Sequence, residues 1–473
     1  GRNHTQQAPR PRPRALCGPH PAILSASDGR NIPFSILALA LAGAALAQPN
    51  LTPGAPQTES ILVVGGTAHL GTGEALDNAA IGFEDGIINF VGPAREVDRK
   101  RYNRVVDVSG MHVYPGFIAP NSTLGLMEVA AVRASRDYQE VGTFKPNVRS
   151  IIAYNAASDI TPTVRTNGVL MGQITPRGGV IGGSSSVVQF DAWNWEDAVV
   201  RADDGIHLYW PSSHHKHYED GRAQLRKRKT YDQKLHEITD FFDRARAYAA
   251  GQTDKRDLRM EAMRGLFAAG DRSAKGAATL FVHANDAKQI AEVIRFKRAQ
   301  DLERVVLVGG VDSWMMADPL RENDIAVMLL RTHSVPRFAE DDIDLPYKLP
   351  KLLEDEGVEY CLQGEGRMPE MNTRNLPFYA GTAVAYGLEY EQAVAALTLS
   401  TAKILGIDAT CGSLERGKDA TLFISAGDAL DMMGNDVRHA WIQGRDVVLD
   451  NKQIQLYEKY KAKYDAQRAA GDR

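Results

Sequence analysis

The sequence predicts an α/β fold, a (β/α)8 TIM-like barrel combined with a β-sandwich that the N- and C-terminal segments form together. A chain of 473 residues is too long for one small domain and suits a barrel with an accessory domain. Its middle alternates between strand-like and helix-like segments, which is typical of βα units around a parallel sheet. Both ends carry short strand-like segments instead, so we expect two half-sheets that pack together.

These patterns divide the chain into five parts. The expected parts are a leader (1–47), the first part of the β-sandwich (48–110), the barrel (111–408), the second part of the β-sandwich (409–450) and a C-terminal helix (451–473). The 44% hydrophobic and 24% charged residues are ordinary for a folded protein, so a large core is expected.

The leader ends in an apolar run from Ile36 to Ala47 that closes on Ala45-Leu46-Ala47, a small-residue cleavage pattern. The run is about 12 residues long, whereas a membrane-crossing helix needs roughly 20. We therefore expect an export signal, a mature chain that begins near Gln48 in the periplasm or outside the cell, and no membrane span. The alternative is a buried Ala-Leu helix.

The net charge argues against nucleic acid as a partner, and the cysteine content argues against a disulfide framework. Removing residues 1–47 takes away five Arg and one Asp, which moves the formal net charge from −4 to −8. An acidic body argues against nucleic acid as a partner. The remaining Cys361 and Cys411 are too few for a disulfide framework and lack a CxxC spacing, so we expect two buried free thiols.

Short apolar runs give the expected strands of both domains. The expected sandwich strands are Ile61–Val64, Ile81–Phe83, Ile87–Val91, Val105–Val108, Ala420–Ile424, Val437–Ile442 and Val447–Leu449. The expected barrel strands are Val113–Thr123, Val169–Ile174, Gly205–Trp210, Thr279–Ala284, Val305–Gly309, Ile325–Leu330 and Val358–Leu362, with a helix from Asp286 to Gln300.

An insertion at about 212–272 differs in character from the barrel around it. Its amphipathic pattern predicts a helical cap over one face of the barrel. The cluster at 214–217 is expected on a solvated loop, with metal binding as the alternative, and the basic run at 226–229 on an exposed helix face.

The stretch Val113–Thr123 is an apolar strand with polar residues at its exit. In an extended strand Ala119, Asn121 and Thr123 share one face. With Pro115-Gly116-Phe117-Ile118 before them, the stretch resembles the first barrel strand of the amidohydrolase superfamily, in its imidazolonepropionase-like and prolidase-like branch. The pattern of that branch is Pro-Gly-Phe-Ile-Asp-x-His-x-His. The segment Gly412–Ala420 resembles the closing segment of the same family.

The resemblance implies a metal site at the C-terminal ends of the strands. Family members use the first-strand Asp-x-His-x-His residues, one His after each of strands 5 and 6 and an Asp after strand 8 to hold one or two divalent metals. Here Ala119, Asn121 and Thr123 replace the first-strand ligands. His283 fits the strand 5 ligand, and Glu365 is the ionic residue near the end of strand 8.

The strand 6 segment Val308–Asp312 contains no His, so the family ligand set is incomplete. A four-ligand zinc site contributes about 10–16 kcal/mol, so each ligand contributes very roughly 3 kcal/mol. The neutral oxygens of Asn121 and Thr123 suit Zn²⁺ less well than imidazole. A divalent metal such as Zn is the cofactor that the resemblance implies, and the ligand count predicts a much weakened or absent centre.

The candidate site residues follow from these positions. We predict His283 and Glu365 as catalytic residues, His283 as a vestigial metal ligand, and Asn121 and Thr123 as substrate-binding residues. Trp193 is a further candidate for substrate binding because it lies near Trp195 and several carboxylates, although a core or capping role explains it equally well. Gly182–Ser186 lacks the spacing of a nucleophile elbow.

Two functions remain open on the sequence. The first is a hydrolase of C–N bonds in cyclic amides or small peptide-like substrates, with a reduced site. The second is a non-catalytic member that binds a ligand or serves as the partner subunit of an intact amidohydrolase. Either could form a homo-oligomer. The family resemblance favours the first function, and the ligand count favours the second.

Overall fold

The computed structural model describes residues 53–219, 222–252, 255–267, 277–338, 340–366 and 368–471. The chain separates into two units, Gly1–Gln48 and Pro49–Arg473, and the described residues all belong to the second. The expected leader and its export signal lie outside the described residues. Within the described part, no helix combines the length and the apolar character needed to cross a membrane.

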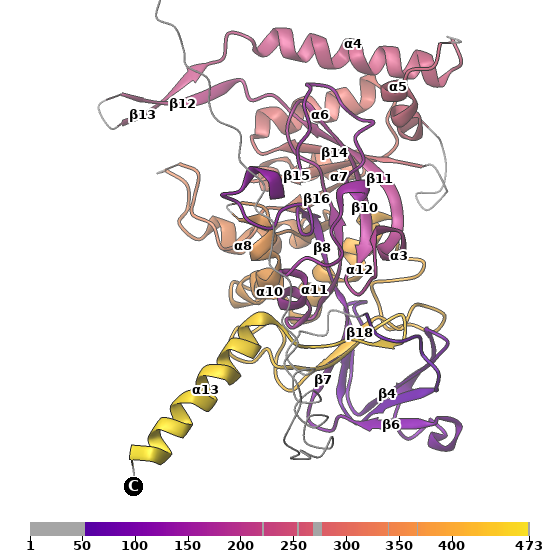
Figure 1. Cartoon of the computed structure of the whole chain (residues 1–473). Helices are drawn as coiled ribbons and strands as arrows, with labels where there is room; N and C mark the ends of the chain where they lie inside the picture. Colours follow the sequence, from indigo (N-terminus) through magenta and orange to yellow (C-terminus); the bar gives the residue numbers. More distant parts are fainter. Residues whose placement is uncertain are drawn as a thin grey trace, which may run out of the picture. The chain divides into compact units, whose positions relative to one another are not determined.

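An eight-stranded sheet forms the barrel (Figure 1). Its strands are β8 (Phe117–Ser122), β9 (Val169–Ile174), β10 (Ile181–Gln189), β11 (Val199–Tyr209), β14 (Thr279–Ala284), β15 (Val305–Gly309), β16 (Ile325–Leu329) and β17 (Tyr360–Leu362), hydrogen-bonded in that order. Most of their residues are buried on both faces, which explains the continuous apolar runs in the sequence.

One strand of the barrel runs against the others. β10 pairs antiparallel with both β9 and β11, whereas β8–β9, β11–β14 and the later pairs are parallel. The connection from β9 to β10 is therefore a loop at the C-terminal ends of the parallel strands, and the connection from β10 to β11 lies at their N-terminal ends. The α/β barrel fold is confirmed, with this hairpin in place of one βα unit.

The expected strand Val113–Thr123 is divided in two at Gly116. β7 (His112–Pro115) belongs to the sandwich, and β8 begins the barrel. A Cβ at Gly116 would lie 2.9 Å from the Thr421 side chain and 3.0 Å from that of Leu170, so only glycine allows this close crossing between the two domains.

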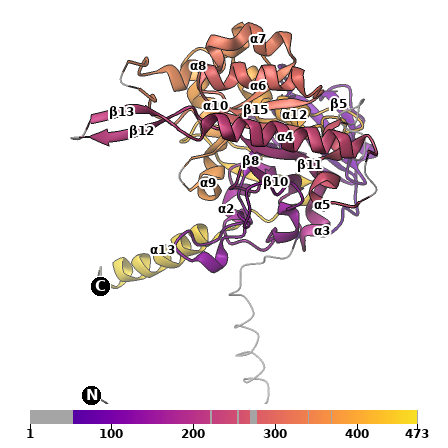
Figure 2. The ribbon, with the colours of Figure 1, turned by 90° about the horizontal axis from the view of Figure 1, so that it is seen from above.

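Helices cover the outside of the barrel (Figure 2). They are α2 (Thr161–Arg165), α3 (Trp195–Ala198), α6 (Ala287–Ala299), α7 (Ala317–Glu322), α8 (Leu345–Asp355), α9 (Pro369–Asn372), α10 (Leu376–Ala385), α11 (Tyr390–Leu397) and α12 (Leu399–Leu405). Short 3-10 helices are η1 (Arg99–Arg101), η2 (Arg133–Ser135), η3 (Ser150–Ala153), η4 (Arg264–Phe267), η5 (Ser313–Met316) and η6 (Thr373–Asn375). α6 matches the expected helix and begins with a capping box between Asp286 and Gln289.

The two ends of the chain form the two sheets of the sandwich. One sheet contains β5 (Ile87–Pro93), β4 (Ala79–Glu84), β1 (Ile61–Val64) and β6 (Arg104–Asp107). The other contains β20 (Arg445–Asp446), β19 (Val437–Ile442), β18 (Leu422–Ser425), β7, β2 (Thr67–His69) and β3 (Ala75–Leu76). β18 pairs with β7, which joins the C-terminal strands to the N-terminal ones. The expected strand Val447–Leu449 is not formed, since β20 ends at Asp446 and the last hydrogen bond to β19 is donated by the backbone N–H of Val447 to Ala440.

The insertion contains both a hairpin and helices. β12 (His214–Glu219) pairs with β13 (Arg222–Lys227), and α4 (Tyr231–Ala249) and α5 (Leu258–Met263) follow. The expectation of a loop at 214–217 and of a helix face at 226–229 was therefore wrong, because backbone pairing across the hairpin satisfies these peptide groups. α4 buries Phe241 and Phe242 as an amphipathic helix should.

The last helix is α13 (Lys452–Gly471), as expected for the C-terminal segment. Cys361 and Cys411 are both buried and free, which also agrees with the sequence.

Candidate functional site

A closed circuit of polar side chains occupies the C-terminal end of the barrel, where the parallel strands of such folds present their functional residues. We call it the polar ring. Its members, in order of contact, are Asn121, Gln173, Asp204, Ser185, His207, His283 and Glu365. They come from β8, β9, β10, β11, β14 and the segment after β17.

Asn121 closes the ring between the first and the last strand of the barrel. A bulge between Ala119 and Ser122 gives Asn121 a positive φ of 52°, a conformation that Asn tolerates better than most residues. Its side-chain nitrogen donates to Gln363 Oε1 at 2.6 Å and to Glu365 Oε2 at 2.9 Å. Its backbone nitrogen donates to the side chain of Gln173 at 3.1 Å.

Asp204 is the buried carboxyl group of the ring. Its oxygens accept hydrogen bonds from Ser185 Oγ and Gln173 Nε2, both at 2.7 Å. Burial raises the pKa of Asp204 to about 6, although these two hydrogen bonds oppose the rise. At pH 7 the group is therefore mostly ionised, and the hydroxyl proton of Ser185 is committed to it.

The hydrogen bond from Ser185 to Asp204 determines the tautomers of His207 and His283. His207 Nε2 lies 3.0 Å from Ser185 Oγ, and His207 Nδ1 lies 3.0 Å from His283 Nε2. Because Ser185 donates to Asp204, His207 Nε2 must donate to Ser185, and His283 Nε2 must donate to His207 Nδ1. The Nδ1 atom of His283 is then a hydrogen-bond acceptor that faces Glu365 Oε2 at 3.8 Å.

Both histidines are neutral. Burial holds the pKa of His207 and of His283 well below the usual value, and the charge of Arg177 lowers that of His283 further. Phe281 stacks on His207 and Tyr209 stacks on His283, with ring centroids 4.8 Å and 4.1 Å apart. These rings fix the imidazole orientations.

Arg177 places a permanent cation at the ring. It lies in the loop between β9 and β10 and donates to the Asn121 side-chain oxygen, and also to the Asn121 carbonyl at 2.8 Å. Burial lowers the pKa of Arg177, but Glu365 and Tyr209 raise it, and the net effect is a rise. The guanidinium is therefore charged and is balanced by the Glu365 carboxylate.

The residues present do not fit the metal centre that the fold implies. Asn121 directs its oxygen to Arg177, and His283 uses Nε2 to reach His207. Thr123 Oγ1 is buried without a hydrogen-bond partner, so one neutral oxygen remains. Across the described ranges, no three His, Cys, Asp or Glu side chains are grouped as a metal site would require. A guanidinium beside the ring also repels a divalent cation.

The structure brings together three of the predicted site residues, namely Asn121, His283 and Glu365. Thr123 follows β8 and is 2% exposed. Trp193 does not belong to this site. It follows the antiparallel β10, so it lies at the N-terminal ends of the parallel strands, and it is 66% exposed. The roles assigned to these side chains stay predictions.

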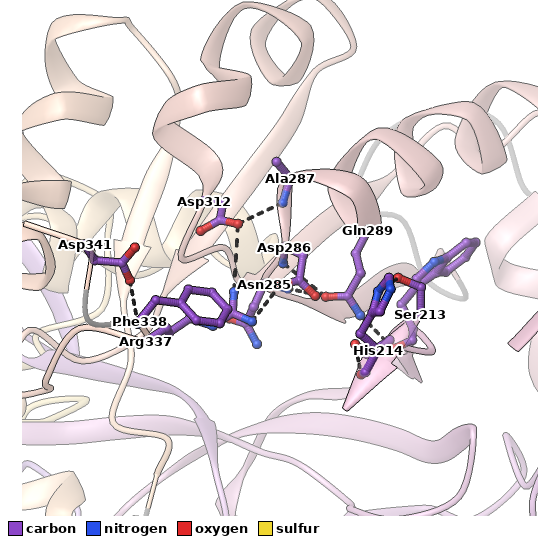
Figure 3. A network of polar contacts seen from close by, with 12 residues as sticks. Ser213, His214, Asn285, Asp286, Ala287, Gln289, Asp312, Arg337, Phe338 and Asp341 are labelled. Atoms are coloured by element: carbon purple, nitrogen blue, oxygen red, sulfur yellow. Dashed lines mark hydrogen bonds and ion pairs between the residues drawn. The ribbon is translucent and has the colours of Figure 1, made fainter. Parts of the chain in front are cut away.

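The predicted strand 6 position is occupied by an ion-pair network (Figure 3). Arg337 donates to Asp286 at 2.6 Å and lies 3.9 Å from Asp312, which also accepts the backbone N–H of Ala287 at 3.0 Å. This network connects the loop after β16 to the start of α6. The carboxylate of Asp312 already bonds within it.

Sequence reasoning missed Gln173, Ser185, Asp204, His207 and Arg177. A signal was present for Gln173 and His207, because each is a polar residue beside apolar neighbours in an expected strand, and such residues are expected to be paired when buried. Ser185 lies in a Gly- and Ser-rich run and Asp204 lies outside the expected strands, so neither carried this signal. Arg177 carried no comparable signal, since it lies in a Gly-rich loop.

Comparisons with known proteins agree with the fold. The model of the amidohydrolase family matches residues 265–447, the second half of the barrel and the last sandwich strands. An amidohydrolase structure from Thermotoga maritima MSB8 has a TM-score of 0.69 and 23% identity, over 82% of this chain and 99% of that one.

Two further solved structures share the fold. A candidate prolidase from Bifidobacterium longum has a TM-score of 0.52 and 16% identity, over 86% of this chain and 100% of that one. Molinate hydrolase has a TM-score of 0.51 and 14% identity, over 84% and 95%. A search of curated proteins finds no match.

A barrel joined to a terminal β-sandwich, with polar residues at the C-terminal ends of the strands, is an amidohydrolase-type fold. Residues 265–447 match the amidohydrolase family, and the barrel with its β-sandwich has the fold of the solved amidohydrolase from Thermotoga maritima.

Proposed function

We propose that this chain is a non-catalytic amidohydrolase-superfamily protein, which binds a small-molecule or peptide-like ligand or serves as the partner subunit of an intact amidohydrolase. The observation that carries the proposal is the bonding of Asn121. Both ends of its amide are engaged, to Gln363 and Glu365 on one side and to Arg177 on the other. A side chain held in this way cannot also coordinate a metal.

The burial of the polar ring is a second observation that favours a structural role over a hydrolytic one. Asp204, Ser185 and His207 are all at most 1% exposed, so water and substrate do not reach them. They hold β9, β10, β11 and β14 together through charge-assisted and neutral hydrogen bonds.

Metal content per chain tests the proposal. The full chain, expressed with zinc and manganese available, is expected to be folded and to hold far less than one metal ion per chain. His283→Ala should leave that value unchanged. Near-stoichiometric metal that is lost in His283→Ala, together with turnover of an amide substrate, would overturn the proposal.

A second candidate is a metal-independent hydrolase of C–N bonds, and one observation favours it. His283 Nδ1 and Glu365 Oε2 are both acceptors 3.8 Å apart, so together they can receive a proton from a bound water or amide. In this case His283→Ala and Glu365→Gln should each abolish hydrolysis of a cyclic amide or dipeptide panel, while Trp193→Ala should have no effect. The absence of turnover by the wild-type chain would exclude this candidate.

We also propose export of the chain, on the strength of the apolar run 36–47 and the cleavage pattern before Gln48. N-terminal sequencing of the cell-associated and the exported protein tests this. A mature N-terminus near Gln48 is expected, and an intact leader on all of the protein would contradict export.

A further inference from the structure

The C-terminal helix α13 carries an unpartnered aromatic stripe. Tyr457, Tyr460 and Tyr464 are spaced by three and four residues and therefore share one face of the helix. Their side chains are 62%, 49% and 51% exposed. α13 extends away from the barrel and the sandwich in both views (Figures 1 and 2). A free helix with such a face is not stabilised by packing in a single chain, so the stripe points to an interaction surface.

The charges that border the stripe are basic. α13 contains five Lys or Arg and two acidic residues. Lys461 and Lys463 flank the tyrosines and lie 5.7 Å and 5.5 Å from the rings of Tyr457 and Tyr464. If two α13 helices paired along their stripes, these lysines would face one another, and like charges at that position are unfavourable. The surface that fits α13 is therefore apolar with an acidic border.

Such a surface is found at the segment 426–436, which connects β18 to β19 and contains three Asp and no Lys or Arg. A pocket of about 300 Å³ lies between this segment and α10. Phe378, Leu430 and Met432 supply its apolar wall, and Asp428 and Asp431 supply its charge. Met432 is 61% exposed.

The one basic-type residue of this pocket, His333, does not cancel the charge. Burial and the charge of Arg331 lower the pKa of His333, so it is neutral at pH 7. Its Nε2 lies 2.8 Å from Thr382 Oγ1. The pocket therefore presents net negative charge to a ligand.

The base of α13 lies close to this pocket. Thr163 in α2 donates to Gln453 in α13 at 3.0 Å, and Asn451 donates to Thr166 at 3.1 Å. Asn435, in the acidic segment, reaches the carbonyl of Asn167 at 3.5 Å. The start of α13 and the acidic segment therefore lie next to each other on the surface. A two-fold axis at this place would allow each copy to dock its helix on the other.

We propose that α13 of one copy docks its tyrosine stripe on the acidic segment 426–436 and the adjoining pocket of a second copy, so that the chain forms a symmetric dimer through exchanged C-terminal helices. A 20-residue helix is about 30 Å long, which is enough to cross onto a neighbouring subunit. The dimer does not depend on the ligand or on the catalytic status of the polar ring.

Light scattering of the full-length chain at micromolar concentration tests the proposal. The wild-type protein is expected to be a dimer that dissociates as salt is raised. The double change Tyr457→Ser with Tyr460→Ser should weaken the dimer at least about tenfold. Lys459→Ser, on the opposite side of the same helix, is the matched control and should leave the dimer intact. All these positions are exposed, so the chain should stay folded.

A charge exchange distinguishes this docking from other dimers. Lys461→Glu and Asp431→Lys should each give a monomer, because each places like charges at the contact. An equimolar mixture of the two variants should recover a dimer, since every contact then pairs opposite charges. A monomeric wild-type chain, a dimer that survives the tyrosine changes, or a mixture that stays monomeric would each overturn the proposal.

Discussion

Two polar clusters of this protein contain the same parts in different arrangements. In the polar ring, His207 and His283 are hydrogen-bonded at 3.0 Å, and a carboxylate, Glu365, lies 3.8 Å from the outer histidine. Where the sandwich meets α11, His69 and His112 are also hydrogen-bonded at 3.0 Å, and Glu391 lies 2.7 Å from His69. Each histidine pair thus has a carboxylate beside one of its rings, at 3.8 Å in the polar ring and at 2.7 Å where the sandwich meets α11.

The comparison teaches that the position of the nearby carboxylate decides whether a pair of neighbouring histidines serves as a link between domains or is left as a pair of hydrogen-bond acceptors. At the sandwich, Glu391 bonds to His69 directly, and Tyr114 stacks on the same ring at 4.3 Å. In the ring, Glu365 is drawn to Asn121 and Arg177 instead, and both histidines stay neutral. The first arrangement joins two domains, and the second leaves an acceptor pair at the barrel end.

The largest expected loss of stability comes from removing the side chain of Asn121, which connects the two ends of the polar ring. Asn121→Ala should lower the free energy of unfolding by about 3–4 kcal/mol, because the side-chain oxygen of Gln363 and one guanidinium nitrogen of Arg177 lose their partner and Ala takes a positive φ. Urea-induced unfolding measures this. Asn78→Ala, an exposed Asn with a φ of 48°, is the control for the backbone alone and should cost about 1 kcal/mol. Equal costs would mean that the ring contributes nothing.

The second prediction concerns pH and uses Asp204. Its folded pKa of about 6 is above the unfolded value, so the unfolded state releases this proton first as pH rises. Stability from this group is therefore complete below about pH 4 and falls by about 2–3 kcal/mol as pH rises to about 6. Asp204→Asn should remove that component from unfolding curves recorded between pH 4 and 7.

Asn at position 204 can still accept from Gln173 and donate to Ser185, so the variant should stay folded. An unchanged pH slope in Asp204→Asn would show that Asp204 is ionised in the native state throughout this range.

A smaller effect is expected at the other cluster. Glu391→Gln should lower the free energy of unfolding by about 1–2 kcal/mol, because it replaces a 2.7 Å charge-assisted hydrogen bond to His69. Thermal or urea unfolding measures it. Glu389→Gln, an exposed neighbour, should change stability by less than about 0.5 kcal/mol. A neutral result for Glu391→Gln would remove the contrast between the two clusters.

The smallest effect is expected from Glu365→Gln. Its carboxylate is 30% exposed, so water screens much of the charge that it places opposite Arg177. It lies 3.8 Å from His283, and a Gln oxygen can still accept from Asn121. We expect a loss below about 1 kcal/mol in the same unfolding assay. A loss as large as that of Glu391→Gln would mean that the distance to the histidine pair does not set the contribution of the carboxylate.

The fold was predictable because the strands carry their own signals. β9, β14 and β15 match the expected ranges to the residue, since each is an apolar run bounded by polar or glycine residues. The direction of β10 was not predictable, because Gly182–Ser186 has neither strand-like bulk nor a turn pattern. The hairpin at 214–227 was missed because basic and histidine residues suggested a loop.

The site was predictable only where one residue carried the information. His283, Asn121 and Glu365 were found because the resemblance to the amidohydrolase pattern assigns a ligand position to each of them. Arg177 and Asp204 could not be found in this way, since their importance depends on contacts between residues far apart in the chain. Trp193 was misplaced because the reversal of β10 moves it to the opposite end of the barrel.

The reversed strand has a consequence for any attempt to give this barrel a metal. Because β9 turns directly into β10, the chain passes over the mouth as a loop, and that loop carries the guanidinium of Arg177. Introducing an acidic residue at 119 and histidines at 121 and 123 would supply ligands and leave the charge of Arg177 in place. Building a metal centre in this barrel would therefore require a new connection between β9 and β10 as well as new side chains.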